Sequence, residues 1–129
     1  MRQKETKTIL DAKAAAGIGT TISLKGYGKA TISVDTEDNA TLTIMVAGSI
    51  QESVPDFSAA QSPSNQFSYL NLTDLEDKGA KSGDTGIAFS GTDGHLMYNV
   101  DFSVLNWICV IVSAYTSGKV TVKIAPAND

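Results

Sequence analysis

The chain has 129 residues, which is the usual size of one domain and too short for two ordinary ones. Hydrophobic residues make up 42% of it and charged residues 19%, a balance that argues against intrinsic disorder. With one cysteine and one histidine it lacks the residues for an intrachain disulfide, a cysteine zinc cage or a site with two imidazoles. A net charge of −4 argues against nucleic-acid binding, because phosphate contacts reward clustered lysine and arginine.

The sequence also gives an expectation about membranes and cellular location. Residues 1–7 are polar and charged, which is not typical of a secretory signal peptide. The longest apolar segment, 107–112, is far shorter than the roughly 20 residues that span a bilayer. We therefore expect no membrane contact and synthesis in a reducing cytoplasm, a description that fits a virion protein assembled inside a host cell.

Alternation of apolar and polar residues is the dominant pattern. Strand side chains point to opposite faces in turn, so a period of two predicts strands with one apolar face. In chain order the expected strands cover residues 6–12, 20–25, 29–35, 41–50, 66–72, 85–90, 95–102, 107–115 and 119–125. For the alanine-rich segment 10–16, a single helical turn ended by Gly17 is the alternative.

The segment Trp107–Val112 differs because residues of both parities are apolar. Such a strand is covered on both faces, either at the centre of a sandwich or at an interface between subunits. We interpret it as the central strand. Cys109, inside it, is expected to be a small buried hydrophobic residue.

Turn-forming residues separate the apolar runs. The segment Thr116–Lys119 predicts a hairpin with Gly118 in the left-handed conformation, and Asp38-Asn39 and Asp93-Gly94 predict further turns. Eight to nine short strands with such turns indicate an all-β fold, an antiparallel β-sandwich of the jelly-roll type. Its predicted core is Ile32, Val34, Leu42, Ile44, Val100, Val110, Val112, Val122 and Ile124.

Two segments do not fit this pattern of strands and tight turns. Residues 51–65 contain two prolines and many polar residues, and residues 74–86 are charged and rich in glycine. Both are expected to be long exposed loops, which in small domains are usually functional or mobile. We divide the chain into a basic N-terminal arm, residues 1–7, and a single domain, residues 8–129.

No catalytic or metal motif is convincing. His95 has no Gly-x-Ser-x-Gly elbow to supply a nucleophile, so we expect it to be a rim residue that faces water. The carboxylates of the 74–86 loop do not have the spacing of a calcium loop, and a solvated loop is favoured. These acidic residues are Asp74, Glu76, Asp77 and Asp84. We expect no enzymatic activity, no catalytic or metal site and no cofactor.

Aromatic residues in the loops are candidates for binding. Phe57 in the 51–65 loop has no local partner in the pattern, and Tyr69 follows the same loop. Either ring would stack on a sugar or dock into a neighbouring subunit, and the sequence does not separate these two roles. Alternation places Tyr98 on the core face instead.

The last third of the chain contains a recognisable series of strands. Tyr98-Asn-Val-Asp-Phe102 leads to Val112-Ser-Ala-Tyr-Thr-Ser-Gly118 and then to Val120-Thr-Val122. This order resembles a segment of small structural proteins of tailed bacteriophages. The earlier segments Gly26–Val34 and Thr43–Ser49 are similar to the opening strands of the same group.

The resemblance implies a virion component with a β-sandwich fold. We predict a non-enzymatic phage structural protein, a capsid decoration or head-fibre protein located on the virion. The alternative is a carbohydrate-binding or receptor-binding module of a phage tail or a bacterial adhesin, with a glycan as its ligand.

The resemblance also implies an assembly. We expect a homotrimer attached to the major capsid protein or another virion protein, with a monomer as the alternative. The basic residues Arg2, Lys4 and Lys7 are the hypothetical capsid contacts, because the rest of the chain is acidic and such segregation suits an acidic partner.

Overall fold

The computed structural model describes residues 2–3, 6–102 and 104–128, and this part of the chain contains no helix. Its strands form one antiparallel sheet with the path β1-β10-β5-β9-β7-β8, and the predicted antiparallel all-β fold is confirmed. No helix long and apolar enough to cross a membrane occurs among the described residues. The strands are β1 (Arg2–Gln3), β2 (Lys7–Lys13), β3 (Gly17–Ile18), β4 (Ile22–Ser23), β5 (Lys29–Ser49), β6 (Ser68–Tyr69), β7 (Leu72–Asp74), β8 (Ala80–Lys81), β9 (Ile87–Val100) and β10 (Trp107–Asn128).

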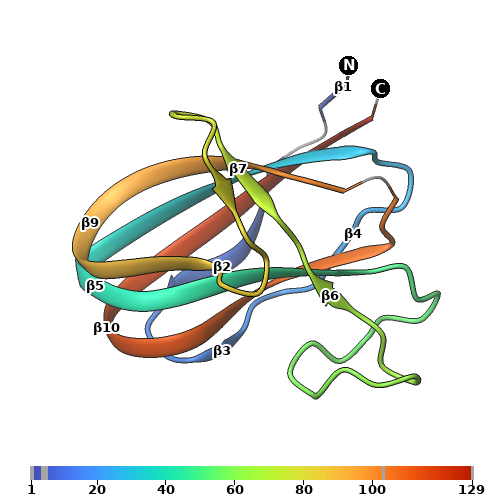
Figure 1. Cartoon of the computed structure of the whole chain (residues 1–129), viewed down its shortest axis with the longest axis horizontal. Helices are drawn as coiled ribbons and strands as arrows, with labels where there is room; N and C mark the ends of the chain where they lie inside the picture. The colour runs from blue at the N-terminus through green and yellow to red at the C-terminus, as the bar shows by residue number, and fades with distance from the viewer. Residues whose placement is uncertain (1, 4–5, 103, 129) are drawn as a thin grey trace.

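Three long strands dominate the sheet. β5, β9 and β10 contain 21, 14 and 22 residues, and β10 pairs with β5 from Trp107 opposite Ser49 to Ala127 opposite Lys29. All three curve together at one end of the molecule, so that the sheet folds over itself into two layers (Figure 1). The expectation of short strands was wrong here, because each long strand unites two of the predicted ones. The jelly-roll type stays a prediction.

The bend lies where the sequence predicted turns. The pairing of β5 with β10 shifts on either side of Ser117, and its pairing with β9 shifts between Thr36 and Ala40. Such bulges insert unpaired residues and bend the strand that carries them. Residues in the left-handed region permit this geometry, with φ of 59° at Asp38 and 54° at Asn39. The residues predicted as turns therefore form bulges.

Gly118 is the residue that this bend requires. Its φ is +87°, and a Cβ atom at this position would lie 2.4 Å from the Cα atom of Ala40 on the neighbouring strand. The predicted left-handed conformation of Gly118 is confirmed. The predicted hairpin at 116–119 is wrong, because β10 continues through it while paired with β5.

All nine residues of the predicted core are buried, with exposed fractions of 5% or less. They come from both sides of the bend, for example Ile32 from the first half of β5 and Ile44 from its second half. The two layers therefore bury their apolar faces against each other, as in a sandwich. This cluster also contains Tyr98, which alternation had placed on the core face.

The strand 107–112 is covered on both faces, as predicted. Ile108, Val110 and Val112 belong to the main core, while Cys109 belongs to a second buried cluster. That second cluster contains Ala47, Phe57 and Phe67, and both phenylalanines lie in the segment between β5 and β6. The second face of this strand is therefore covered by a loop of the same chain.

The N-terminal segment joins the sheet. β2 pairs with β10 from Lys7 opposite Ile124 to Lys13 opposite Val120, so the alternative of a helical turn at 10–16 was wrong. In β1, Arg2 lies opposite Asn128 at the end of the same strand. The described part of the predicted arm is therefore bound along the last third of β10, and the boundary at residue 7 falls at the start of β2.

Candidate functional site

The most elaborate part of the surface is the segment between β5 and β6, residues 50–67. It lies at the end of the molecule away from the bend (Figure 1). Sequence analysis predicted residues 51–65 to be an exposed loop, and most of them are exposed. Its two phenylalanines are not, because Phe57 is 3% exposed and Phe67 is 7% exposed. Their ring centroids lie 5.1 Å apart, and they anchor the loop on Cys109.

One asparagine side chain holds the two arms of this loop together. The Oδ1 of Asn65 accepts a hydrogen bond from the backbone N–H of Asp56 at 2.8 Å. Its Nδ2 donates to the carbonyl oxygens of Asp56 at 2.9 Å and Ala60 at 3.1 Å. Because one side chain satisfies three backbone groups, the loop keeps one conformation without regular secondary structure.

The base of the loop is fixed in the same way. The side-chain oxygen of Gln51 accepts a hydrogen bond from the backbone N–H of Gln66 at 3.0 Å, which joins the two ends. The Nε1 of Trp107 donates to the carbonyl oxygen of Gln51 at 2.9 Å, which attaches the base to β10. The loop is therefore a preformed structure and not a flexible connection.

The Asp56 carboxylate belongs to a tight turn within the loop. It accepts hydrogen bonds from the hydroxyl of Ser58 and from the backbone N–H of Ser58, the latter at 2.9 Å. Because these bonds favour the charged form, they hold the pKa of Asp56 below its usual value. This carboxylate stabilises the loop locally.

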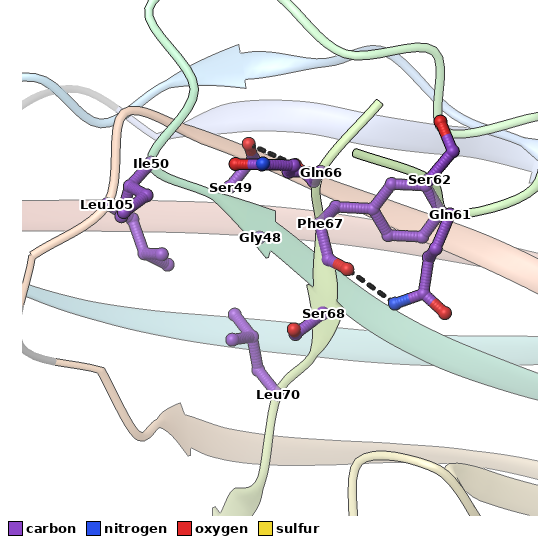
Figure 2. Close-up of a pocket in the computed structure, with 10 residues that line it drawn as sticks. All are labelled: Gly48, Ser49, Ile50, Gln61, Ser62, Gln66, Phe67, Ser68, Leu70 and Leu105. Atoms are coloured by element: carbon purple, nitrogen blue, oxygen red, sulfur yellow. Dashed lines mark hydrogen bonds between the residues drawn. The ribbon is translucent and has the colours of Figure 1, made fainter. Parts of the chain in front are cut away.

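A pocket of about 590 Å³ opens between this loop, the end of β5 and residue 105. Its volume lies within the range of small-molecule sites, roughly 300–1,000 Å³. No charged side chain lines it. The lining residues, labelled in Figure 2, are Gly48, Ser49, Ile50, Gln61, Ser62, Gln66, Phe67, Ser68, Leu70 and Leu105.

Gly48 forms the floor of this pocket. A Cβ atom at Gly48 would lie 2.7 Å from Leu105 Cδ1 and 3.0 Å from Leu70 Cδ1. The missing side chain therefore lets both leucines approach the strand. In Figure 2 they lie on two sides of Gly48, and Ser68 lies near Leu70. Apolar and polar groups thus meet in one concave surface.

The predicted aromatic contacts are not on the open face of this pocket. Phe57 is buried within its own chain, so it does not offer an exposed ring to a ligand or a neighbouring subunit. Tyr69 is half-buried and packs edge-on against Phe67, with ring centroids 5.9 Å apart. Sequence analysis missed the pocket itself. Its only signal there is the clustering of serine and glutamine in residues 58–68.

The predicted basic contacts lie elsewhere. Lys7 is exposed at the start of β2, and Arg2 takes part in the sheet through its backbone in β1. Both lie beside the C-terminal part of β10. Lys4 is outside the described residues, so the structure does not bring the three together as a described patch.

The remaining candidates for chemistry have simple surroundings. His95 is exposed, as predicted, and its Nδ1 lies 2.6 Å from Asp35 Oδ1 on the neighbouring strand. The prediction of an exposed loop at 74–86 was wrong in part, because Asp74 ends β7 and is 8% exposed, and Ala80–Lys81 form β8, which pairs with β7. The carboxylates of Asp74 and Asp77 accept hydrogen bonds from nearby backbone N–H groups. Among the described residues no group of three or more His, Cys, Asp or Glu is placed to hold a metal ion. Cys109 is buried, as predicted, and burial raises the pKa of its thiol.

Comparisons with known proteins give one informative result. No known protein family and no curated protein sequence matches the chain. A solved structure, that of the SPBc2 prophage-derived protein YomS, is similar with a TM-score of 0.70. The similarity covers 98% of this chain and 96% of that chain, at 10% sequence identity. At this identity the likeness establishes a common fold over the whole length.

Proposed function

We propose that the chain is a non-enzymatic structural protein of a tailed-phage particle, located on the particle surface as a capsid decoration or head-fibre protein. The observation that carries this proposal is the whole-length likeness to a protein derived from a prophage. The strand series of residues 96–124, which resembles small phage structural proteins, supports the same class independently.

The shape and charge of the chain suit such a role. At the bend the exposed residues are polar or charged. They include the acidic residues Glu37, Asp38 and Asp93, and Lys119, whose Nζ lies 3.5 Å from Asp38 Oδ2. The continuous strands leave few exposed polar backbone groups there, because β5 is paired on both sides close to the bend. A stiff, acidic surface of this kind is soluble and resists association when it faces solvent.

The proposed partner is the major capsid protein or another virion protein, and the proposed assembly is a homotrimer. Arg2, Lys4 and Lys7 are the proposed contacts, because they place positive charge at one end of an acidic chain. β1 and the start of β2 bring the backbone of Arg2 and Lys7 beside the C-terminal part of β10. A particle surface would then be contacted by a sheet edge that carries basic residues.

The proposal is tested by adding the purified chain to phage particles that lack it and sedimenting the particles. We expect saturable binding that weakens as salt concentration rises. The combined variant Arg2→Glu, Lys4→Glu and Lys7→Glu should lose at least tenfold in affinity. The variant Lys78→Glu, Lys81→Glu and Lys119→Glu changes the net charge equally and should bind normally. Failure of the wild-type chain to sediment with particles would contradict the proposal.

A carbohydrate-binding module remains the second candidate. The pocket of Figure 2 favours it, because it combines uncharged polar side chains with an apolar floor. Phe57 is not the binding residue in this version, since it is buried. Particle association and sugar binding are measured separately, so each candidate can fail without the other.

A further inference from the structure

Strand β9 is paired unevenly on its two sides. On one side β5 accompanies it from Ile87 to Asn99, whereas on the other side β7 pairs with it only at Tyr98–Val100. Within the part of the chain that the structure describes, no strand pairs with this second side between residues 87 and 96. Figure 1 shows the two halves of β9 in different layers, so an open edge of the sheet follows both layers around the bend.

The direction of the backbone groups along this edge follows from a hydrogen bond of the neighbouring strand. The N–H of Leu70 donates to the carbonyl oxygen of Val46, so the backbone groups of Val46 point away from β10. In an antiparallel ladder this direction alternates along the strand, so Ile44 bonds to its partner Ile87 and Ala88 points outward. The N–H and C=O groups of Ala88 therefore face the open edge.

The other half of β9 has outward groups as well. The N–H of Leu75 donates to the carbonyl oxygen of Met97, so the backbone groups of Met97 point toward β7. By alternation those of His95 point to the same side. There β7 has already turned away, because the N–H of Lys78 donates to the carbonyl oxygen of Asp74 in a turn. Unpaired backbone groups of this kind accept an added strand.

A cavity of about 360 Å³ follows this edge. Three consecutive residues from each half of β9 line it, 87–89 and 94–96, and we call it the β9 slot. Because neighbouring strand residues point to opposite faces, a cavity that contacts three in a row lies along the backbone edge. Its floor is apolar, since the lining residues Phe89 and Tyr98 belong to the main core. Open backbone groups and an apolar floor thus meet in one slot.

The composition of this edge differs from that of the other edge strands. Charged residues and proline commonly protect a sheet edge from pairing with another chain. β2 carries Lys7, Asp11 and Lys13, and β8 carries Lys81. Residues 87–92 of β9 contain neither a charged residue nor a proline. The edge that borders the slot therefore lacks the side chains that prevent the addition of a strand.

The opposite wall of the slot limits what can enter it. Asp74 of β7 and Lys81 of β8 line this wall. A folded second copy that approached the edge would bring its own second layer against β7 and β8, whereas a single extended segment enters between them and β9. The segment is short, because the strand bends at Gly91, which has a φ of +59°. The slot therefore fits one short strand and not a second sheet.

We propose that the β9 slot binds a short extended segment of another virion protein, which joins the sheet as a strand beside Ala88. Its backbone accepts from the N–H of Ala88 and donates to the carbonyl oxygen of Ala88. One of its apolar side chains covers Phe89 and Tyr98. This inference rests on the proposed function, because it names a second contact with the particle besides the basic segment.

Two variants at residue 88 isolate the backbone N–H. Ala88→Pro removes the outward N–H without breaking a bond to β5, and proline is tolerated at such edge positions. Ala88→Val keeps the N–H and changes a side chain that is exposed. In sedimentation with particles that lack the chain, Ala88→Pro should bind at least tenfold more weakly than wild type, and Ala88→Val should bind normally. Equal binding of a folded Ala88→Pro protein would overturn the inference and leave the proposed function intact.

Hydrogen exchange of the wild-type chain gives a second readout. In the free chain, the amide proton of Ala88 should exchange at least tenfold faster than those of Ile87 and Phe89, which point to β5. On the particle, exchange at Ala88 should slow at least tenfold. Fast exchange at Ala88 on the particle, or slow exchange in the dilute free chain, would contradict an added strand.

The remaining outcomes separate the partner from the site. Protection of Ala88 that grows with the concentration of the chain alone would assign the slot to a second copy and overturn the assignment to a virion partner. Failure of the wild-type chain to sediment with particles would contradict the proposed function, and this inference with it.

Discussion

Thr36 brings a hydroxyl group into the interior next to the bend of β5. It is 4% exposed, and within the described residues its Oγ1 has no hydrogen-bond partner. A buried polar group without a partner costs about 1–3 kcal/mol. This position therefore lowers the stability of an otherwise apolar core.

Thr36→Val replaces the hydroxyl by a methyl group of nearly the same shape. We expect the variant to be more stable by about 1 kcal/mol, because the desolvation cost disappears while packing and β-branching are kept. Urea unfolding of both proteins measures the difference. Thr36→Ser, which keeps the hydroxyl and removes the methyl group, should be less stable than wild type.

Tyr98 gives a stability change at alkaline pH. Burial and the carboxylates of Asp74 and Asp77 raise the pKa of its hydroxyl from 10.0 to about 12. Between these two pH values the unfolded chain loses a proton that the folded chain retains. The protonated hydroxyl of Tyr98 therefore makes a contribution of about 2–3 kcal/mol to the free energy of unfolding. This contribution is fully present below pH 10 and is lost as the pH rises through 12.

The prediction is checked by comparing urea unfolding at pH 8 and pH 11 for wild type and Tyr98→Phe. The wild-type free energy of unfolding should fall more steeply with pH, because the variant lacks the titrating group. Parallel pH dependence in the two proteins would show that this hydroxyl has no raised pKa.

At the scale of elements, the bend decides the architecture. All nine residues that alternation assigned to the core are buried, because alternation depends only on which face is apolar. It did not predict that six of the expected strands join in pairs to form the three continuous strands β5, β9 and β10. Gly118, Asp38 and Asn39 suit a bulge and a hairpin turn equally well, since both need residues in the left-handed backbone conformation. Pairing with a distant strand selects between them.

Gly118→Ala tests the bend directly. A side chain there would require a strained φ and a 2.4 Å approach to the backbone of Ala40, so we expect a loss of more than about 2 kcal/mol. Gly28→Ala is the control, because a Cβ atom at Gly28 would have no neighbour within 4 Å and its φ is not positive. Thermal unfolding compares the two. A tolerated alanine at 118 would contradict the bulge geometry.

The 50–67 loop is the second element that the sequence described only in part. The sequence showed the length and polarity of this loop, but not the residues that anchor it on the sheet. Phe57 and Phe67 are ten positions apart, and they meet where the side chains of Asn65 and Gln51 close the loop through hydrogen bonds to backbone groups. No local periodicity records such contacts. The pocket, which depends on this closure, was therefore beyond sequence analysis.

Phe57→Ala should loosen the packing of the 50–67 loop over Cys109. The loss of a buried ring costs about 3–5 kcal/mol, and it also uncovers Cys109. We expect a thiol reagent to label Cys109 much faster in the variant under native conditions. Leu72→Ala removes a comparably buried side chain from the main core, so it controls for stability alone. Equal labelling of the two variants would mean that Cys109 reacts only after global unfolding.

On the scale of the whole molecule, the two ends differ in character. The bend end is polar and closed by continuous strands, whereas the opposite end carries the 50–67 loop, the pocket and both ends of the described chain (Figure 1). A protein on a particle surface needs one end for attachment and one that faces solvent. The pairing of β1 and β2 with β10 places the proposed attachment segment beside the last strand.

The central claim is that the chain is a component of a phage particle. The most direct measurement is quantitative mass spectrometry of particles purified from a native lysate on a density gradient. We predict that most copies of the chain sediment with the particles, at a fixed number per particle that is a multiple of three. Recovery of the chain only in the soluble fraction, with no constant ratio to capsid protein, would contradict the account.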